Sequence, residues 1–179
     1  MKSHFDKITK IGDITINRLL KTQCMDENHP EYGGFIVEGK GFSEPAWVIR
    51  NACYYIAQYY NEKSKYYKNP LLLDRAKKAL LYTVSRQYED GTIDLLETNF
   101  HDATAVAFVI QQAAYAYRVM EKYSEKSSEE TFIMDPLYDF FEKSAYGIKN
   151  GGFHTPNHRW VMCSALALLI NILNRKDLY

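Results

Sequence analysis

The amino-acid sequence predicts an all-α fold of about six main helices, arranged as antiparallel helical hairpins. Apolar residues recur at helical spacing through most of the 179 residues. Strand-like alternation is confined to two short stretches, GGFIVEG and GTIDLL, each between glycines or beside a turn. The length lies in the usual range for one domain, which we place at residues 1–179.

Three helices are predicted in the first half of the chain. The first runs from roughly Lys2 to Thr22, where isoleucine and leucine recur at helical spacing. The second begins at Pro45, with Ser43 as its cap and Glu44 placed against the helix dipole, and reaches about Asn61. The third begins after Asn69-Pro70 and continues to Tyr88.

Three more helices are predicted in the second half. The fourth starts near Asp102, whose carboxylate can cap it, and extends to Tyr123. A charged link containing SEKSSEET follows. The fifth covers about Asp135 to Lys149, with Pro136 in its first turn, and the sixth opens at Asn157 as the cap of WVMCSALALLINIL.

The links between these helices alternate in character. Glycine-bearing segments precede the second, fourth and sixth helices, and charged links follow the second and fourth. The starts near Glu44, Asp102 and Asn157 lie 58 and 55 residues apart (residue 44 to 102, then 102 to 157), which predicts a hairpin repeat with a period in the mid-fifties. In a stack of antiparallel pairs every second link lies at the same end, so the three glycine-bearing loops should share one face.

Helices that follow the glycine-bearing loops are nearly apolar all round, whereas their partners carry charges on one side. The first kind is typical of buried, inner helices and the second of an outer layer. An inner and an outer layer of hairpins is the plan of a partial α/α toroid. The alternative is an ordinary multi-helix bundle.

Composition limits the classes of partner. Lys and Arg together number 22, as do Asp and Glu, so no net charge draws the chain to nucleic acid or to an anionic membrane. The amino end has no signal-peptide core and no stretch is long and apolar enough for a membrane span. We therefore expect a cytoplasmic protein without nucleic-acid or membrane partners. Its three widely spaced cysteines predict structural thiols.

Candidate site residues lie in the three glycine-bearing loops or in the helix turn that follows each loop. They are Tyr32, Trp47, Asn99, His101, His154, Asn157, His158, Arg159 and Trp160. Aromatic rings stack on sugar faces, while amide, imidazole and guanidinium groups hold hydroxyls or a carboxylate. The loop face therefore predicts a carbohydrate site, whose ligand would be an oligo- or polysaccharide.

Other interpretations of the same residues remain open. His154 and His158 are four residues apart, as zinc ligands on a helix are, but Pro156 places His154 before the helix, so no metal or cofactor is expected. Each histidine can instead bond a carbonyl at a helix end. Arg159 can instead form an ion pair with Glu97 or Asp102.

GTIDLLETNFHDATAVAFVIQ and, about fifty residues later, GGFHTPNHRWVMCSALAL resemble the amino-terminal part of α/α-toroid proteins of the heparinase II/III-like polysaccharide lyase and glycosidase group. The likeness covers roughly Glu31 to Leu173. It implies β-elimination on uronate polysaccharides, in which a neutralised carboxylate makes the neighbouring proton removable.

On this resemblance, Asn99, Asn157, His158 and Arg159 are candidates for recognising the substrate, with Trp47 and Trp160 as stacking rings. Tyr32, His154 and His101 are candidates for proton transfer, and His101 also for carboxylate recognition. The family uses about ten or more helices, commonly followed by a β-sandwich, so this chain is expected to be a fragment or to complete its ring with another chain.

Exposed apolar sides of the first and last hairpins would favour association into a homo-oligomer. Two further functions remain as alternatives. One is a non-catalytic helical-repeat module that binds a protein or a glycan. The other is a glycoside hydrolase, for which Glu38, Glu97 and Asp102 are the available acids.

Overall fold

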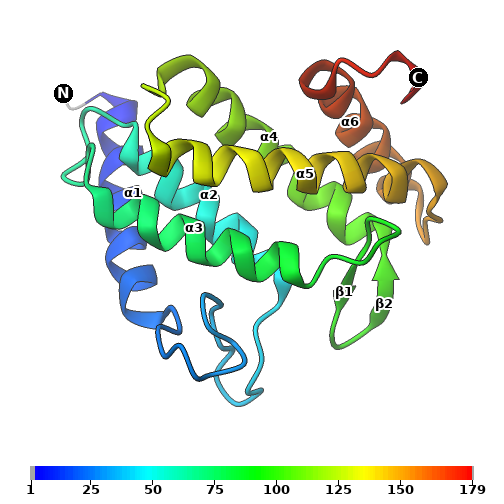
Figure 1. The fold of residues 1–179 in the computed structure, drawn as a ribbon, viewed down its shortest axis with the longest axis horizontal. Coiled ribbons are helices and arrows are strands. Elements are labelled where there is room, and N and C mark those ends of the chain that lie inside the picture. Colours follow the sequence, from blue (N-terminus) through cyan, green and yellow to red (C-terminus); the bar gives the residue numbers. More distant parts are fainter. Residues whose placement is uncertain (1–2, 179) are drawn as a thin grey trace.

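A computed structural model describes residues 3–178 of the chain. Six α-helices form most of it (Figure 1): α1 (His4–Thr22), α2 (Pro45–Tyr59), α3 (Pro70–Ser85), α4 (Ala103–Tyr123), α5 (Ser128–Asn150) and α6 (Pro156–Leu173). The rest includes an antiparallel hairpin of β1 (Ile93–Leu95) and β2 (Asn99–Asp102), and a short 3-10 turn, η1 (Lys176–Leu178). The all-α class is confirmed. GTIDLL supplies β1, GGFIVEG forms no strand, and the predicted start at Lys2 lies outside the described residues.

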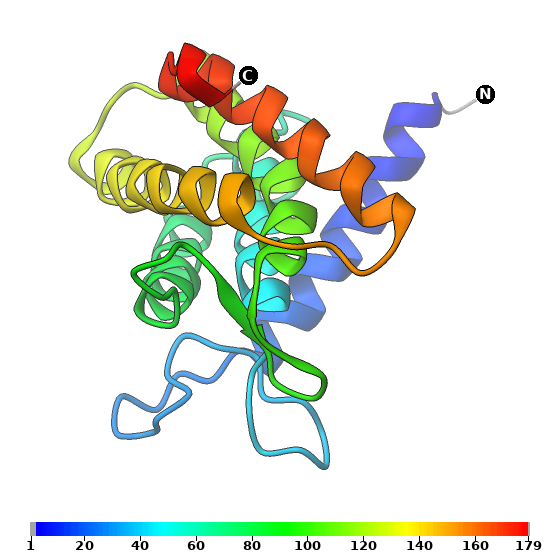
Figure 2. The same ribbon diagram turned by 90° about the vertical axis from the view of Figure 1, so that its right-hand side faces the viewer.

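The helices lie in layers (Figures 1 and 2). α3 and α5 pack side by side, α2 and α4 lie behind them, and α1 and much of α6 lie on the other side of α2 and α4. α2 and α4 run parallel, and both begin at the end where the β-hairpin lies. No helix of residues 3–178 is long and apolar enough to cross a membrane.

α2 and α4 form the centre of the core, as their apolar composition predicts. Their fully buried side chains include Val48, Tyr55, Val106 and Ile110. α6 was also expected to be a buried inner helix, but it is buried on one side only. α6 buries one side, through Met162 and three other residues, and leaves the rest open because it packs on α4 and α5 alone among the main helices.

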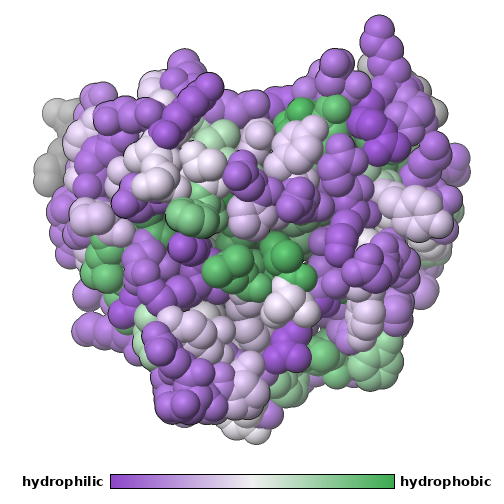
Figure 3. Space-filling model, in the orientation of Figure 1, coloured by the Kyte–Doolittle hydropathy of each residue, from purple (hydrophilic) through white to green (hydrophobic). Residues whose placement is uncertain are grey.

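The outer faces differ in kind. α3 and α5 form a largely hydrophilic face with a small hydrophobic area near its centre (Figure 3). α1 instead exposes four large apolar side chains, those of Phe5, Ile8, Ile11 and Ile14. This exposed side of the first hairpin is the feature from which self-association is predicted.

An internal repeat relates α2, α4 and α6. The segments WVIRNA (47–52), FVIQQA (108–113) and WVMCSA (160–165) begin two, five and four residues after the starts of α2, α4 and α6. In each segment the leading aromatic residue is exposed and the closing alanine is buried. The three helices thus share a short sequence and burial pattern, and the hairpin repeat stays a prediction.

Two glycines join successive hairpins in the same way. Gly33 and Gly91 both have positive φ, 86° and 81°, which glycine adopts without steric cost. A Cβ atom added at Gly33 would lie 2.9 Å from the carbonyl carbon of Lys78 in α3, and one added at Gly91 would lie 2.5 Å from that of Lys143 in α5. The first two glycine-bearing loops thus pack directly on the backbone of the hairpin that follows each of them.

Two buried glutamines strengthen these contacts. The Gln23 side-chain amide donates to the Gly33 carbonyl at 2.9 Å and to a carbonyl of α3. Gln87 donates to the Gly91 carbonyl at 3.2 Å and to a carbonyl of α5. The repeated pattern shows that the loops hold the hairpins together as well as connecting helices.

Asp102 caps α4 as predicted, and Asn69 also caps α3, but the two other predicted caps are wrong. The Ser43 side chain is buried and makes no cap bond, and α2 starts after Glu44 without a side-chain cap. α6 starts after Thr155, so Asn157 lies inside its first turn, where its side chain accepts the Thr155 hydroxyl. Proline follows each uncapped start and lacks the N–H that a cap would satisfy.

The predicted start of α5 at Asp135 is also wrong. The helix begins seven residues earlier, at Ser128, and Pro136 lies inside it. Ser127 and Glu130 form a capping box, in which each side chain accepts the backbone N–H of the other residue. The S-x-x-E pattern lies within the segment interpreted above as a charged link.

Buried carboxylates hold several helix ends in place. Glu130 is 1% exposed and accepts bonds from the Tyr60 and Ser124 hydroxyls. Burial alone would raise its pKa, but these bonds and the Ser127 N–H outweigh burial and hold the pKa below its ordinary value. The pKa of Glu31 is lowered in the same way.

We expect stability to fall steeply in acid for this reason. A carboxylate whose folded pKa is lowered stabilises the fold above its unfolded pKa, and this contribution is lost as pH falls through the folded pKa. For Glu31 and Glu130 the loss lies below the ordinary value of 4.5. Urea unfolding across this range should show the decline, and Glu130→Gln should reduce it. Equal pH dependence in the variant would contradict the assignment.

Candidate functional site

A cavity of about 370 Å³ lies where the starts of α2, α4 and α6 meet the β-hairpin. Its lining includes Trp47, Arg50, Asn99, Asp102, Phe108 and His158. The first turns of the three helices converge here, and they bring side chains more than 100 positions apart in the sequence to one space. Of the three loops that were expected to share one face, only the β-hairpin loop contributes to the lining.

Trp47 and Arg50 form the α2 wall of this cavity. The residues are one helical turn apart, so they lie on the same side of α2. The guanidinium carbon of Arg50 lies 4.7 Å from the centre of the Trp47 ring, a cation–π contact. The Nε atom of Arg50 is buried without a hydrogen-bond partner, and no ion pair within residues 3–178 includes Arg50. A positive group thus lines the cavity with its charge unpaired.

His158 lines the cavity from the first turn of α6, and His154 lies beside it outside the lining. The His158 ring packs edge-on against Phe108, with centroids 5.8 Å apart, and its Nδ1 atom is buried without a hydrogen-bond partner. His154 lies edge-on to His158, and its Nε2 atom is 3.5 Å from the amide nitrogen of Asn99. Because buried polar atoms are normally bonded, the Arg50 and His158 nitrogens mark unmet hydrogen-bonding capacity around one space.

Asp102 contributes negative charge, but its oxygens are engaged. It accepts bonds from the Thr104 hydroxyl, from the Ala105 N–H at 2.7 Å and from the Asn99 amide at 2.9 Å. Burial alone would raise its pKa, but these bonds outweigh burial, so the pKa lies below its ordinary value. Asp102 is therefore a charged helix cap that also orients Asn99.

A second cavity of about 380 Å³ adjoins the first and shares the Trp47 side chain with it. Lys40 and Glu97 form an ion pair at its edge. Glu44 also lines it, and its pKa is raised, first by burial and then by the negative charges of Glu97 and Asp94. The loop before α2 and the β-hairpin thus meet beside the first cavity.

Two of the predicted proton-transfer residues lie elsewhere. Tyr32 does not line either cavity, and its hydroxyl is 3.5 Å from Glu27 in its own loop. His101 stacks on Tyr88, with centroids 3.8 Å apart, and its Nδ1 atom lies 2.8 Å from Asp90. His154 is the proton-transfer candidate that the structure places beside the cavity.

The residues after the α6 start diverge, as their spacing around a helix requires. Asn157 and Arg159 are exposed and do not line the cavity. The guanidinium of Arg159 lies 5.9 Å from the Phe153 ring, and its predicted ion pair with Glu97 or Asp102 is not formed. Trp160 is 78% exposed and also lies outside the cavity. Within residues 3–178 no group of three or more His, Cys, Asp or Glu could hold a metal ion.

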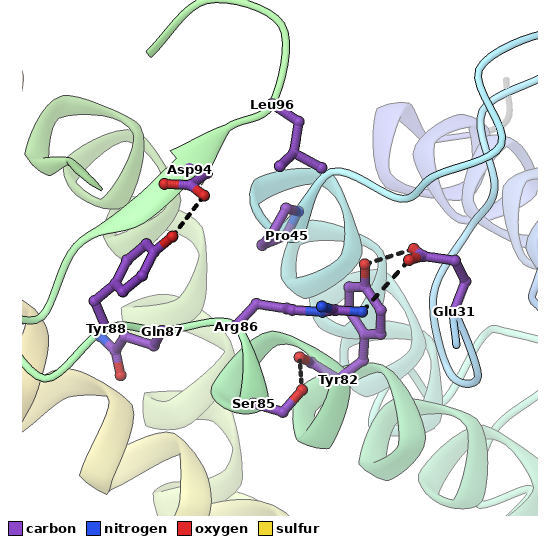
Figure 4. Close-up of a pocket in the computed structure, with 9 residues that line it drawn as sticks. All are labelled: Glu31, Pro45, Tyr82, Ser85, Arg86, Gln87, Tyr88, Asp94 and Leu96. Atoms are coloured by element: carbon purple, nitrogen blue, oxygen red, sulfur yellow. Dashed lines mark hydrogen bonds and ion pairs between the residues drawn. The ribbon is translucent and has the colours of Figure 1, made fainter. Parts of the chain in front are cut away.

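A third cavity, of about 280 Å³, lies between the end of α3, the loop before α2 and the hairpin (Figure 4). Glu31 accepts the Tyr82 hydroxyl at 2.6 Å and an Arg86 guanidinium N–H at 3.4 Å, and Tyr88 donates to Asp94. These groups satisfy one another's hydrogen bonds. Glu31 holds the loop before α2 to the end of α3, and Asp94 holds β1 to Tyr88. The first cavity, whose lining includes the unpartnered side chains of Arg50 and His158, is therefore the candidate site.

Arg50 is the site residue that the sequence interpretation missed. It lies within the apolar segment AWVIRNACYYIAQYY, where one charged residue stands among buried neighbours, three positions after Trp47. An arginine in that position is a signal because the side chain must reach a polar space. Because site residues were expected mainly in loops, Arg50 was not chosen as a candidate.

Comparison of the chain with protein-family models, with curated proteins and with solved structures found no match. The function is therefore argued from the chemistry of the cavity and from the repeated architecture around it.

Proposed function

We propose that this chain is a carbohydrate-binding protein of the α/α-toroid type, whose cavity at the starts of α2, α4 and α6 binds a carboxylate-bearing sugar. One observation carries the proposal. Arg50 lies over Trp47 in a cavity, unpaired, with a second unpartnered nitrogen on His158 in the same lining. Such a site combines a ring for a sugar face with donors for a carboxylate and hydroxyls.

The toroid assignment is supported by the layers and by the repeat. α2, α4 and α6 share a short sequence and burial pattern, and Gly33 and Gly91 join the first two glycine-bearing loops to the following hairpins in the same manner. Repetition of one packing step is how hairpin arrays build curved or closed assemblies. An ordinary bundle does not require the contacts at Gly33 and Gly91 to recur.

The polar groups have separable roles in ligand binding. The Arg50 guanidinium can donate to a uronate carboxylate, for which its planar fork is well suited. His158 and Asn99 are placed for sugar hydroxyls, since both line the same space. Trp47 and Phe108 supply apolar surfaces for the ring faces.

The resemblance to heparinase II/III-like lyases further suggests β-elimination on uronate polysaccharides. In that reaction Arg50 would neutralise the carboxylate, and His154 would remove the proton from the neighbouring carbon. The electron pair left on that carbon would form the C=C bond as the glycosidic C–O bond breaks, and the departing oxygen would take a proton from the protonated His154 or from water. Tyr32 and His101 lie outside the cavity. This placement favours binding as the primary function, and turnover by this chain would depend on His154.

Uronate polysaccharides therefore test both the proposed binding and the proposed elimination reaction. Binding is measured by calorimetry, and elimination by the absorbance of the unsaturated product. We expect His154→Ala to leave the dissociation constant within about threefold of the parent value while abolishing any product. His4→Ala, at the exposed start of α1, is the matched control. Absence of binding by the parent chain would defeat the proposal, and product formation by His154→Ala would defeat the role of His154.

A hydrolase is less well supported by the same geometry. Glu44 has a raised pKa, as a general acid requires, and it lines the adjoining cavity. The second carboxylate that hydrolysis needs would be Glu97, which is held in the ion pair with Lys40. Asp102 is engaged as the cap of α4.

A further inference from the structure

We infer that α1 docks on the surface of an anionic lipid bilayer, through a solvent-facing stripe of apolar and basic side chains. The stripe consists of Lys7, Ile11, Ile14 and Arg18. α1 forms an edge of the molecule (Figures 1 and 2), and none of its residues lines any of the three cavities described above. The inference is therefore independent of the proposed sugar binding.

The four residues of the stripe lie on the side of α1 that faces away from the core. They follow one another at steps of four, three and four residues, so they lie within about 60° of one another around the helix. Ile16, which is fully buried, lies about 200° around the same helix from Ile14. α1 packs mainly on α2, which leaves the stripe open.

Core packing does not explain the two isoleucines of the stripe. Ile11 and Ile14 are 64% and 63% exposed, although isoleucine is among the residue types most often buried. Ile8, which borders the stripe, is 54% exposed. An apolar surface of this kind on one edge helix indicates a binding surface.

The unpaired charges of α1 are mostly positive. Asp6 forms an ion pair with Lys63 at 2.7 Å, and the half-buried Asp13 accepts the Ser64 hydroxyl at 2.5 Å. Four cations of α1 form no ion pair within residues 3–178: Lys7, Lys10, Arg18 and Lys21. The net charge of zero, on which the expectation of no membrane partner was based, does not reveal this local excess.

An anionic bilayer suits the stripe better than a second copy of the chain does. In an antiparallel pair of α1 helices centred on the isoleucines, Lys7 of one copy would lie opposite Arg18 of the other, and like charges repel. Lipid phosphates would bind both cations, while Ile11 and Ile14 enter the boundary of the acyl chains. Basic side chains can do this because their stems lie along apolar surface while their charged ends reach the headgroups.

Sedimentation of the full chain with lipid vesicles tests the inference. One vesicle is phosphatidylcholine alone, and the other contains about a third phosphatidylglycerol. We expect binding to the anionic vesicle alone, and weaker binding as salt rises. Ile11→Ser combined with Ile14→Ser, and Lys7→Gln combined with Arg18→Gln, should each weaken this binding about tenfold or more. All four positions are on the surface, so circular dichroism should show the parent fold.

Two double variants serve as matched controls. Leu71→Ser combined with Leu81→Ser removes two exposed apolar side chains from α3. Lys149→Gln combined with Lys176→Gln removes two exposed cations near the carboxyl end, at the other side of the molecule from α1 in Figure 1. Both should bind the anionic vesicle as the parent chain does.

A tryptophan in the stripe distinguishes insertion from adsorption. Ile14→Trp, combined with Trp47→Phe and Trp160→Phe, gives a chain whose single tryptophan lies in the stripe. Its emission should shift to shorter wavelength on the anionic vesicle and be quenched by brominated lipid.

Three results would overturn the inference: no binding of the parent chain to the anionic vesicle, parental binding by both stripe variants, or tryptophan emission that brominated lipid does not quench. Binding of an acidic amphipathic peptide without any vesicle binding would also overturn it, and would identify α1 as a docking helix for a protein. None of these results bears on uronate binding.

Discussion

Replacing Gly91 with alanine is expected to lower the free energy of unfolding by about 3 kcal/mol or more, one of the largest losses from a single methyl group in this chain. Its φ of 81° is a conformation in which a non-glycine residue is strained by about 1–2 kcal/mol. The added Cβ would also overlap the Lys143 carbonyl oxygen and approach its carbon to 2.5 Å. Because both partners are backbone atoms, the loop and α5 must separate.

Gly39 provides the matched control for this prediction. Its φ is 78°, but a Cβ there would meet no atom within 4 Å. Gly39→Ala should therefore cost only the conformational part, about 1 kcal/mol. Urea unfolding of the two variants separates strain from the close approach. If both lose the same amount, the contact between the Gly91 loop and α5 does not stabilise the fold.

Replacing Arg50 with alanine is expected to weaken binding of a uronate oligosaccharide by about 2 kcal/mol, or roughly thirtyfold in Kd. The variant loses the unpaired cation of the cavity together with its contact to Trp47. Its effect on stability should stay small, because Arg50 forms no ion pair within residues 3–178 and its Nε atom has no hydrogen-bond partner there.

Arg118→Ala is the control, because it removes the same positive charge from a position outside the cavity. Arg118 is exposed on α4 almost three turns beyond Phe108 and does not line the cavity. Calorimetry should show nearly parental affinity for this variant at the same ionic strength. A neutral oligosaccharide should lose little affinity from Arg50→Ala. Equal losses for the acidic and the neutral ligand would show that Arg50 contributes packing and does not recognise a carboxylate.

Much of the helical framework could be predicted because local chemistry determines it. The Asp102 cap and the apolar helix that follows it lie where the sequence indicates. The start of α5 could also have been found, because Ser127 and Glu130 form a recognisable capping box. Pro136 was misleading, since a proline is typical of a first turn but lies in the helix interior here.

Convergence of the three helix starts could be predicted from the alternation of links, but the direction of individual side chains could not. His101 has a φ of 51°, and its ring stacks on Tyr88, whereas Asn99 contacts Asp102 and lies 3.5 Å from His154. Tyr32 follows Glu31, whose buried carboxylate holds that loop to Tyr82. These orientations depend on contacts between residues about ten to fifty positions apart, which no local pattern reveals.

The glycine contacts also affect how the molecule loses its structure. The Gly33 and Gly91 loops each contact the hairpin that comes after them, so neighbouring hairpins share part of their stability. Local unfolding that starts at one end of the molecule should therefore spread from hairpin to hairpin through the packing contacts of Gly33 and Gly91. Hydrogen exchange would then reveal a gradient of protection along the array, steepest where one of these contacts has been weakened.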